Sequence, residues 1–149
     1  MITRPVFYPL VKKLHQPRRF IQILVGPRDT GKTTLARQAI QAFSHRATFA
    51  SADGPAAADE VWLEQQWDIA RHNCRQGGSW LLVLDEVERI PRWAELVRRM
   101  WDRDTELKLE IRVLLIGSSA TLVEGGLANA LTDRFELSLA GHWNFAEMR

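Results

Sequence analysis

The sequence predicts an α/β fold in which a parallel sheet carries helices on both of its faces. One observation is the alternation of short apolar runs with longer stretches whose apolar residues recur at helical spacing, the pattern of successive β–α–β units. Another is that some short runs are apolar throughout, as in parallel strands buried on both faces. The length of 149 residues suffices for one domain with one core.

Five strands are predicted, with helices in the connections between them. The expected strands span residues 20–25, 47–51, 80–84, 111–116 and 135–139. Connections between parallel strands of one sheet are right-handed in nearly all proteins, which places crossover helices against the faces of the sheet.

Three helices are predicted from their apolar residues. The first follows residue 33 and has apolar residues at Leu35, Ala36, Ala39, Ile40 and Phe43. The second spans residues 57–73, with Cys74 expected in the core beside its apolar face, and ends at Gly77-Gly78. The third follows Pro91, a residue that suits the first turn of a helix, and its buried stripe is Trp93, Leu96, Val97, Met100 and Trp101.

A glycine loop between the first strand and the first helix fits the phosphate-binding pattern G-x-x-x-x-G-K-[ST]. Gly26 and Gly31 permit backbone angles that turn successive N–H groups inward, and the first N–H groups of the helix lack partners of their own. A polyphosphate supplies these acceptors. Lys32 is expected on the β- and γ-phosphates, and the Thr33 hydroxyl on Mg²⁺. The candidate nucleotide-binding residues are Gly26, Pro27, Arg28, Asp29, Thr30, Gly31, Lys32, Thr33 and Thr34.

Two carboxylates follow the apolar run 80–84. Open α/β sheets bind ligands outside the carboxyl ends of their strands, so Asp85 and Glu86 are placed near the phosphate loop. Asp85 is the expected metal ligand, acting through the water shell of Mg²⁺, and Glu86 is expected to polarise the attacking water. The alternative is that the two acids only cap the next turn.

Composition limits the other classes of function. The formal charge is only +2, too weak by itself to argue for nucleic acid. A single cysteine excludes an internal disulfide and favours a reducing cytoplasm, and the four histidines show no zinc spacing. No apolar run approaches the roughly 20 residues that cross a bilayer, and no signal-peptide core is evident, so no membrane is expected. Residues 1–18 form an arm with helical apolar spacing and basic residues, which either packs beside the sheet or presents a basic patch to a partner.

The motifs together resemble the predicted AAA-type ATPases of bacteria and archaea, whose phosphate-loop domain usually continues into a winged helix and a nuclease-like region. The resemblance covers almost the whole chain. It is carried by residues 26–34, by Leu84-Asp85-Glu86-Val87 with Ile90-Pro91-Arg92-Trp93, by Ile116-Gly117-Ser118-Ser119-Ala120, and by Asp133-Arg134-Phe135 with Phe145-Ala146-Glu147.

The resemblance implies a P-loop NTPase sandwich of three layers, α/β/α, with the strand order 5-1-4-3-2. Ser118 or Ser119 is then a sensor beside the γ-phosphate, the alternative being a plain serine turn. Arg134 matches an arginine finger or phosphate sensor, although Asp133 stands where the family often has glycine and its carboxylate could hold the arginine back. Arg28 matches a frequent arginine in the loop. The implied organisation is an arm at 1–18, the ATPase domain at 19–140, and at 141–149 the start of a C-terminal region that the sequence does not include.

Three functions are compared. The first is a Mg²⁺-dependent ATPase, with turnover expected to be slow in isolation if a neighbouring copy must supply the arginine. The second is a nucleotide-gated interaction module, in which ATP orders loops that bind a protein or nucleic acid. The third is a GTPase or small-molecule kinase. The sequence has no Asn-Lys-x-Asp element, which is expected for guanine, and no evident acceptor-binding lid, and both observations argue against this class.

Overall fold

The computed structural model describes residues 18, 20–25, 32–43, 46–52, 58–117 and 135–139, with the side chains of residues 25, 32–35 and 136–139 outside this description. Its elements follow in the order β1 (Ile21–Val25), α2 (Lys32–Ala42), β2 (Ala47–Ser51), α3 (Glu60–Gly77), β3 (Trp80–Asp85), η1 (Val87–Arg89), α4 (Trp93–Glu106), β4 (Ile111–Gly117) and β5 (Phe135–Leu139). The predicted arm at 1–18 lies outside the described residues except for Arg18, and so does the segment 118–134.

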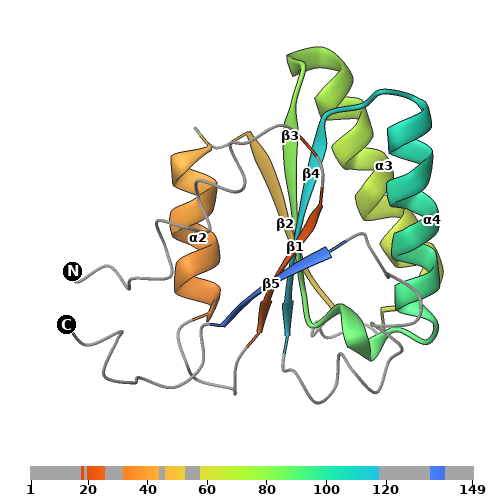
Figure 1. The fold of residues 1–149 in the computed structure, drawn as a ribbon. Helices are drawn as coiled ribbons and strands as arrows, with labels where there is room; N and C mark the ends of the chain where they lie inside the picture. The colour runs from red at the N-terminus through yellow and green to blue at the C-terminus, as the bar shows by residue number, and fades with distance from the viewer. Residues whose placement is uncertain are drawn as a thin grey trace.

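The strands form one parallel sheet in the order β2-β3-β4-β1-β5. Strands β1 to β4 therefore stand in the expected order 1-4-3-2, and β5 pairs with the free side of β1 from Ile21↔Phe135 to Val25↔Leu139. Helix α2 lies on one face of the sheet, and α3 and α4 lie together on the other (Figure 1). We call these the α2 face and the α3/α4 face.

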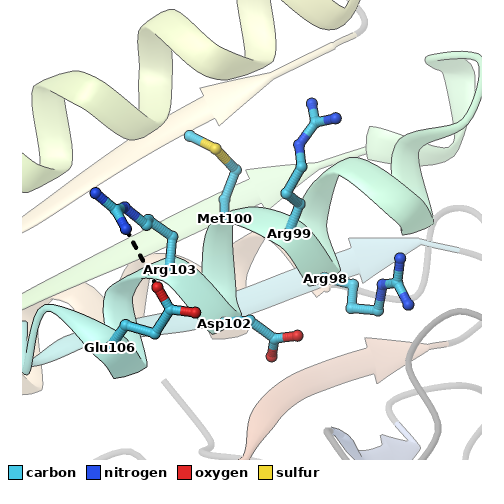
Figure 2. A pocket seen from close by; sticks show the side chains of 6 residues that line it. All are labelled: Arg98, Arg99, Met100, Asp102, Arg103 and Glu106. Carbon is cyan, nitrogen blue, oxygen red and sulfur yellow. Dashed lines mark hydrogen bonds and ion pairs between the residues drawn. The ribbon is translucent and has the colours of Figure 1, made fainter.

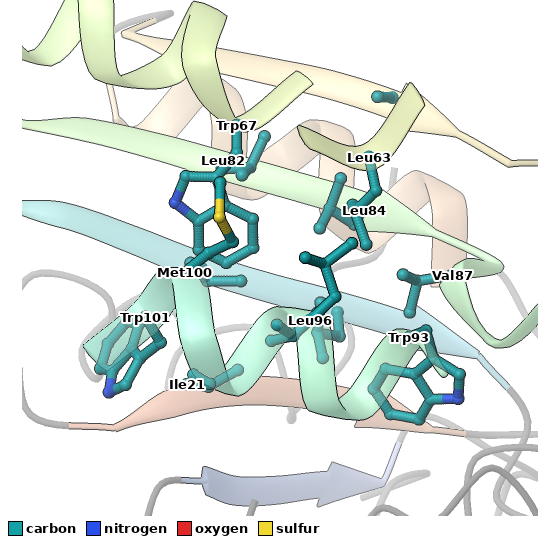
Figure 3. Close-up of a cluster of buried hydrophobic side chains, with 14 of the residues drawn as sticks. Ile21, Leu63, Trp67, Leu82, Leu84, Val87, Trp93, Leu96, Met100 and Trp101 are labelled. Atoms are coloured by element: carbon teal, nitrogen blue, oxygen red, sulfur yellow. The ribbon is translucent and has the colours of Figure 1, made fainter. Parts of the chain in front are cut away.

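Strand alternation divides the core between the two faces. On the α3/α4 face, Leu82 and Leu84 of β3 pack with Val113 and Leu115 of β4 in a large cluster that contains the indoles of α3 and α4 (Figure 3). On the α2 face, residues of opposite parity pack with Ala36, Ala39 and Phe43 of α2, and these strand residues are Leu24, Leu81, Val83, Leu114 and Ile116. Burial on both faces explains why these strands read as continuous apolar runs.

The helix boundaries differ from the predicted ones in two places. Helix α3 starts three residues later than expected, at Glu60, because the Asp59 side chain accepts a hydrogen bond from the Trp62 amide at 2.9 Å and caps the helix. Pro91 is not in the first turn of α4, which begins at Trp93 after Arg92 in the left-handed conformation (φ 58°). The end of α3 is as predicted, with Gly78 (φ 91°) as its left-handed cap. The predicted burial of Cys74 and of the α4 stripe is confirmed.

Arg18 attaches the start of the described chain to α4 and β4. Its guanidinium lies 3.5 Å from the centre of the Trp101 ring and donates to the carbonyls of Trp101 and Ile111, each at 2.8 Å, and to Thr105 Oγ1 at 2.7 Å. Burial lowers the pKa of Arg18, an effect that the nearby Asp104 opposes. Arg18 thus packs against α4 and the start of β4.

Asp104 is a fully buried charge that joins α3 to α4. Its two oxygens accept hydrogen bonds from Trp67 Nε1 and Arg71 Nε, both at 2.7 Å, and Arg71 also donates to the Met100 carbonyl. These hydrogen bonds satisfy the buried carboxylate, and the indole N–H of Trp67 in turn has Asp104 as its acceptor.

Asp104→Ala is expected to lower the free energy of unfolding by about 3–5 kcal/mol, because it leaves the buried indole N–H of Trp67 without its acceptor and removes the carboxylate that Arg71 pairs with. Urea denaturation of the variant measures the loss. Glu106→Ala is the matched control, since it breaks an exposed ion pair to Arg103 on the same helix and should change stability by at most about 1 kcal/mol. Equal effects of the two substitutions would contradict the assigned role of Asp104.

Candidate functional site

The carboxyl ends of four strands lie level with one another. Asp85 of β3 pairs with Ser51 of β2 on one side and with Ile116 of β4 on the other, and Ile116 pairs in turn with Leu24 of β1. Because neighbouring strands are about 4.8 Å apart, the Cα atom of Asp85 lies about 10 Å from that of Leu24, across β4. We call this level row of strand ends the carboxyl rim.

Asp85 projects from the rim on the α2 face. It is the last residue of β3, whereas the sequence placed it after the strand, and it therefore follows the alternation set by Leu81 and Val83, which pack against α2. Residues 26–31 connect the rim end of β1 to Lys32, where α2 begins. The carboxylate and the amino end of α2 are thus on the same face and at the same end of the sheet.

Ser51 is a site residue that the sequence reasoning missed. Its hydroxyl donates to Asp85 Oδ2 at 3.2 Å, and the backbone continues the contact, since the Ala52 amide donates to the Asp85 carbonyl at 2.9 Å. The sequence offered one signal, a polar residue at the end of the predicted strand 47–51. Its meaning depends on β2 lying next to β3.

Glu86 turns the chain away from the strand. It has the left-handed conformation (φ 55°, ψ 35°), which is uncommon for a residue with a long side chain, and its amide donates to the Ile116 carbonyl at 2.9 Å. Its carboxylate is paired with Arg89, with 3.4 Å between Oε2 and Nε, and 21% of the Glu86 side chain is exposed. The turn thus carries the second acid of the motif onto η1.

Glu88 lies against the end of β4. A Cβ atom built on Gly117 would be only 2.6 Å and 2.9 Å from the two Glu88 carboxylate oxygens. Gly117 follows the alternation of Val113 and Leu115, so this contact is on the α3/α4 face. A side chain at this position would have to displace the Glu88 carboxylate, the end of a flexible side chain, from the space that it occupies.

The structure describes only part of the predicted site. It brings Asp85 and Glu86 to the rim and starts α2 at Lys32, with Thr33 and Thr34 in the first helical turn and their side chains outside the description. Gly26, Pro27, Arg28, Asp29, Thr30, Gly31, Ser118, Ser119 and Arg134 lie outside the described residues. Among the residues that are described, no group of three or more His, Cys, Asp or Glu side chains is arranged to hold a metal ion by itself. None of the described helices is long and apolar enough to cross a membrane.

A separate hollow of about 530 Å³ lies on α4, lined among others by Arg98, Arg99 and Arg103. Figure 2 shows that these arginines point in different directions and that Arg103 is paired with Glu106. Arg99 is within 3.5 Å of Glu64. Because the guanidinium groups do not converge, the hollow is not a second anion site.

Comparison with known proteins identifies a family and several curated relatives. A family model described as an AAA domain matches residues 18–149. The RecA protein of Borrelia duttonii is 32% identical over 66% of this chain and 32% of its own length. An uncharacterized protein of Mycobacterium bovis is 30% identical over 86% of this chain and 26% of its own length. The chain therefore spans about a third or less of these curated relatives.

A solved structure shares the fold. The Aeropyrum pernix ORC1 protein, in a structure with DNA, matches 99% of this chain and 48% of its own with a TM-score of 0.69 and 13% identity. At that identity the likeness concerns the arrangement of the sheet and helices alone.

Gly117→Ala is expected to destabilise the protein by about 1–3 kcal/mol, because its methyl group must displace the Glu88 carboxylate. The double variant Gly117→Ala/Glu88→Ala should lose less than the sum of the two single changes, with a coupling of about 1 kcal/mol, since truncation of Glu88 vacates the space. Urea titration of all four proteins completes the cycle. Strict additivity would show that the two residues do not share this space.

Proposed function

Because the chain belongs to the AAA domain family, we propose that it is a Mg²⁺-dependent ATPase module that binds a nucleoside triphosphate at the carboxyl rim. One observation carries the proposal: Asp85 projects from the rim on the same face as the amino end of α2. A carboxylate opposite a helix amino end is the arrangement that receives a metal ion together with a phosphate.

Residues 26–34 are the proposed phosphate-binding loop. The start of α2 at Lys32 supports this role, since the N–H groups of the first turn need acceptors from outside the helix. No acidic residue occupies that first turn, so its partial positive charge is available to an anion. In this proposal Lys32 neutralises the β- and γ-phosphates.

The described residues at the rim fit a magnesium ion. Asp85 and Ser51 supply hard oxygen atoms 3.2 Å apart, and the Ser51 hydroxyl donates to one oxygen of the Asp85 carboxylate. Mg²⁺ is usually held by one or two carboxylates with water and substrate phosphates, so a cage of three acids is not needed. When bound, the ion would neutralise charge on the phosphates. Asp85 would hold it with the Thr33 hydroxyl.

Glu86 is the proposed group that orients the attacking water. It follows Asp85 directly at the end of β3, and its backbone is held at the rim by the Ile116 carbonyl. Ser118 and Ser119 follow β4 and are proposed as the γ-phosphate sensors, and Arg134 precedes β5 as the proposed arginine finger. The proposed ATPase domain spans 19–140, and a cytoplasmic location is proposed from the single cysteine.

The second candidate function is a nucleotide-gated switch with little turnover of its own, acting with a protein or DNA. The ion pair between Glu86 and Arg89 favours it, because a paired base is less available to water. A switch that acts with DNA is suggested by the protein of similar fold, whose solved structure includes DNA. Turnover separates the two functions.

Lys32→Ala is expected to weaken ATP binding at least tenfold while leaving the fold intact, because it removes a cation from the phosphates. In a thermal-shift assay, ATP at about 100 times its dissociation constant should stabilise the wild-type protein by roughly 2.7 kcal/mol, and the variant by clearly less at the same concentration. Arg37→Ala removes an exposed cation from the same helix and serves as the control. Stronger stabilisation by GTP than by ATP would overturn the adenine assignment.

Glu86→Gln is expected to keep ATP binding and lower turnover by about 10²–10⁴-fold, since the amide cannot accept a proton from water. Phosphate release at saturating ATP measures the loss, and Glu95→Gln, on the exposed surface of α4, is the control. Unchanged hydrolysis in the Glu86 variant would remove the catalytic assignment. Binding without measurable turnover in the wild-type protein would favour the switch.

A further inference from the structure

Strand β2 is a terminal strand of the described sheet, and the hydrogen bonds at its two ends show which of its residues face β3. At the start, the Leu81 amide donates to the Arg46 carbonyl at 3.0 Å. At the end, the Ala52 amide donates to the Asp85 carbonyl at 2.9 Å. Alternate residues of a strand bond to the same neighbour in a parallel ladder. The even-numbered residues of β2 therefore bond to β3, and the odd-numbered residues, with Phe49 at their centre, direct their backbone N–H and C=O groups to the outer edge.

The side chain of Phe49 lies at this edge and is partly open to solvent. Phe49 is in register with Val83, whose side chain packs against α2, so its ring is on the α2 face. It is nevertheless 37% exposed, and it is the one aromatic residue among the exposed large apolar side chains in the described part of the chain. A strand that pairs with this edge would remove the ring from water.

Strand β2 lacks the features that usually prevent pairing at a sheet edge. It contains no charged residue and no proline, and its register with β3 runs without a bulge from its first residue to its last. Its five residues are an ordinary strand length. The strand at the opposite end of the sheet, β5, contains Glu136. Of these two terminal strands, β2 is therefore the better suited to accept another strand.

We propose that β2 pairs with β2 of a second copy of this chain, antiparallel and about a two-fold axis through Phe49; the pairing is independent of the proposed ATPase function. Phe49 is the third of the five residues, so this register overlaps the two strands along their whole length and places Phe49 opposite Phe49 of the second copy. Because both residues direct their backbone groups outward, they exchange two N–H···O=C hydrogen bonds. Their rings lie on the same face of the joined sheet and form a cross-strand aromatic pair.

The charges beside the strand favour the antiparallel direction. In the sequence, His45 and Arg46 come directly before β2, and the first charged residue after it is Asp53. An antiparallel pair places the basic end of each strand beside the acidic end of the other, whereas a parallel pair places like charges together. The two-fold contact uses the β2 edge of both copies, so association through this edge stops at a dimer.

Sedimentation velocity of the wild type and of Phe49→Lys, at protein concentrations from about 1 to 200 μM, tests the association. The wild type should show a monomer–dimer equilibrium. Phe49→Lys should raise the dissociation constant at least about tenfold, because it places like charges opposite each other at the axis. Ile69→Lys, which changes an exposed apolar residue of α3, is the matched control and should leave the association unchanged. A wild type that stays monomeric overturns the proposal, and so does a dimer that Phe49→Lys leaves intact.

Disulfide cross-linking with oxidised glutathione tests the register without the lysine variant. In Phe49→Cys, the two Cα atoms at position 49 are expected about 5.5 Å apart, within the range of a disulfide. In Ala47→Cys, the two Cα atoms at position 47 are expected about 14 Å apart, so this variant is the control on the same strand. Both variants retain the buried Cys74. Phe49→Cys should form a covalent dimer and Ala47→Cys should not. Equal cross-linking of the two variants, or none in Phe49→Cys, overturns the proposal.

Discussion

The pleat and register of the parallel sheet determine the geometry of the whole rim. Because β1 to β4 are parallel and in register, their carboxyl ends meet in one row, and because successive side chains alternate, each residue at that row is assigned to one face. A shift of one residue in β3 would move Asp85 to the opposite face and also bury the wrong side chains of the strand against α2. The packing of Leu81 and Val83 against α2 therefore fixes the register of β3 and, with it, the face to which Asp85 points.

The two layers of helix contribute unequally to that packing. The α3/α4 face holds the large cluster with the buried indoles of Trp67 and Trp93, whereas α2 covers its face with smaller side chains such as Ala36 and Ala39. Asp104 of α4 accepts hydrogen bonds from Trp67 and Arg71 of α3. The two helices that carry the larger buried side chains are therefore also joined to each other. The turn after β3 adjoins this layer, because Val87 is buried in its core and Glu88 lies against Gly117. The proposed phosphate loop, residues 26–34, leads into α2 on the other face.

Local patterns in the sequence predicted the parts of the site that depend on one segment. The start of α2 near Lys32 follows from the glycine loop, and the carboxyl end of β3 follows from an apolar run that stops at Asp85. The strand order 1-4-3-2 came from the family resemblance, because spacing alone does not say which strands are neighbours. Contacts between segments were not predictable for the same reason. Ser51 meets Asp85 only because β2 lies beside β3, and Asp104 is buried only because α3 lies against α4. The left-handed turn at Glu86 also overrides the usual preference of a glutamate.

The left-handed conformation of Glu86 takes its side chain to a different place from the one that a continuing strand would give it. In an extended strand Glu86 would simply point to the face opposite Asp85 and be packed against the core beside Leu84. The left-handed turn instead lifts the chain off the sheet at the rim, where 21% of the Glu86 side chain is exposed and its carboxylate contacts Arg89. Such a backbone is strained by about 1–3 kcal/mol and persists only where its surroundings hold it. Here they do so on both sides, through the Ile116 carbonyl and the buried Val87. The fold thus stabilises a turn that takes the second acid out of the strand while the first stays in it.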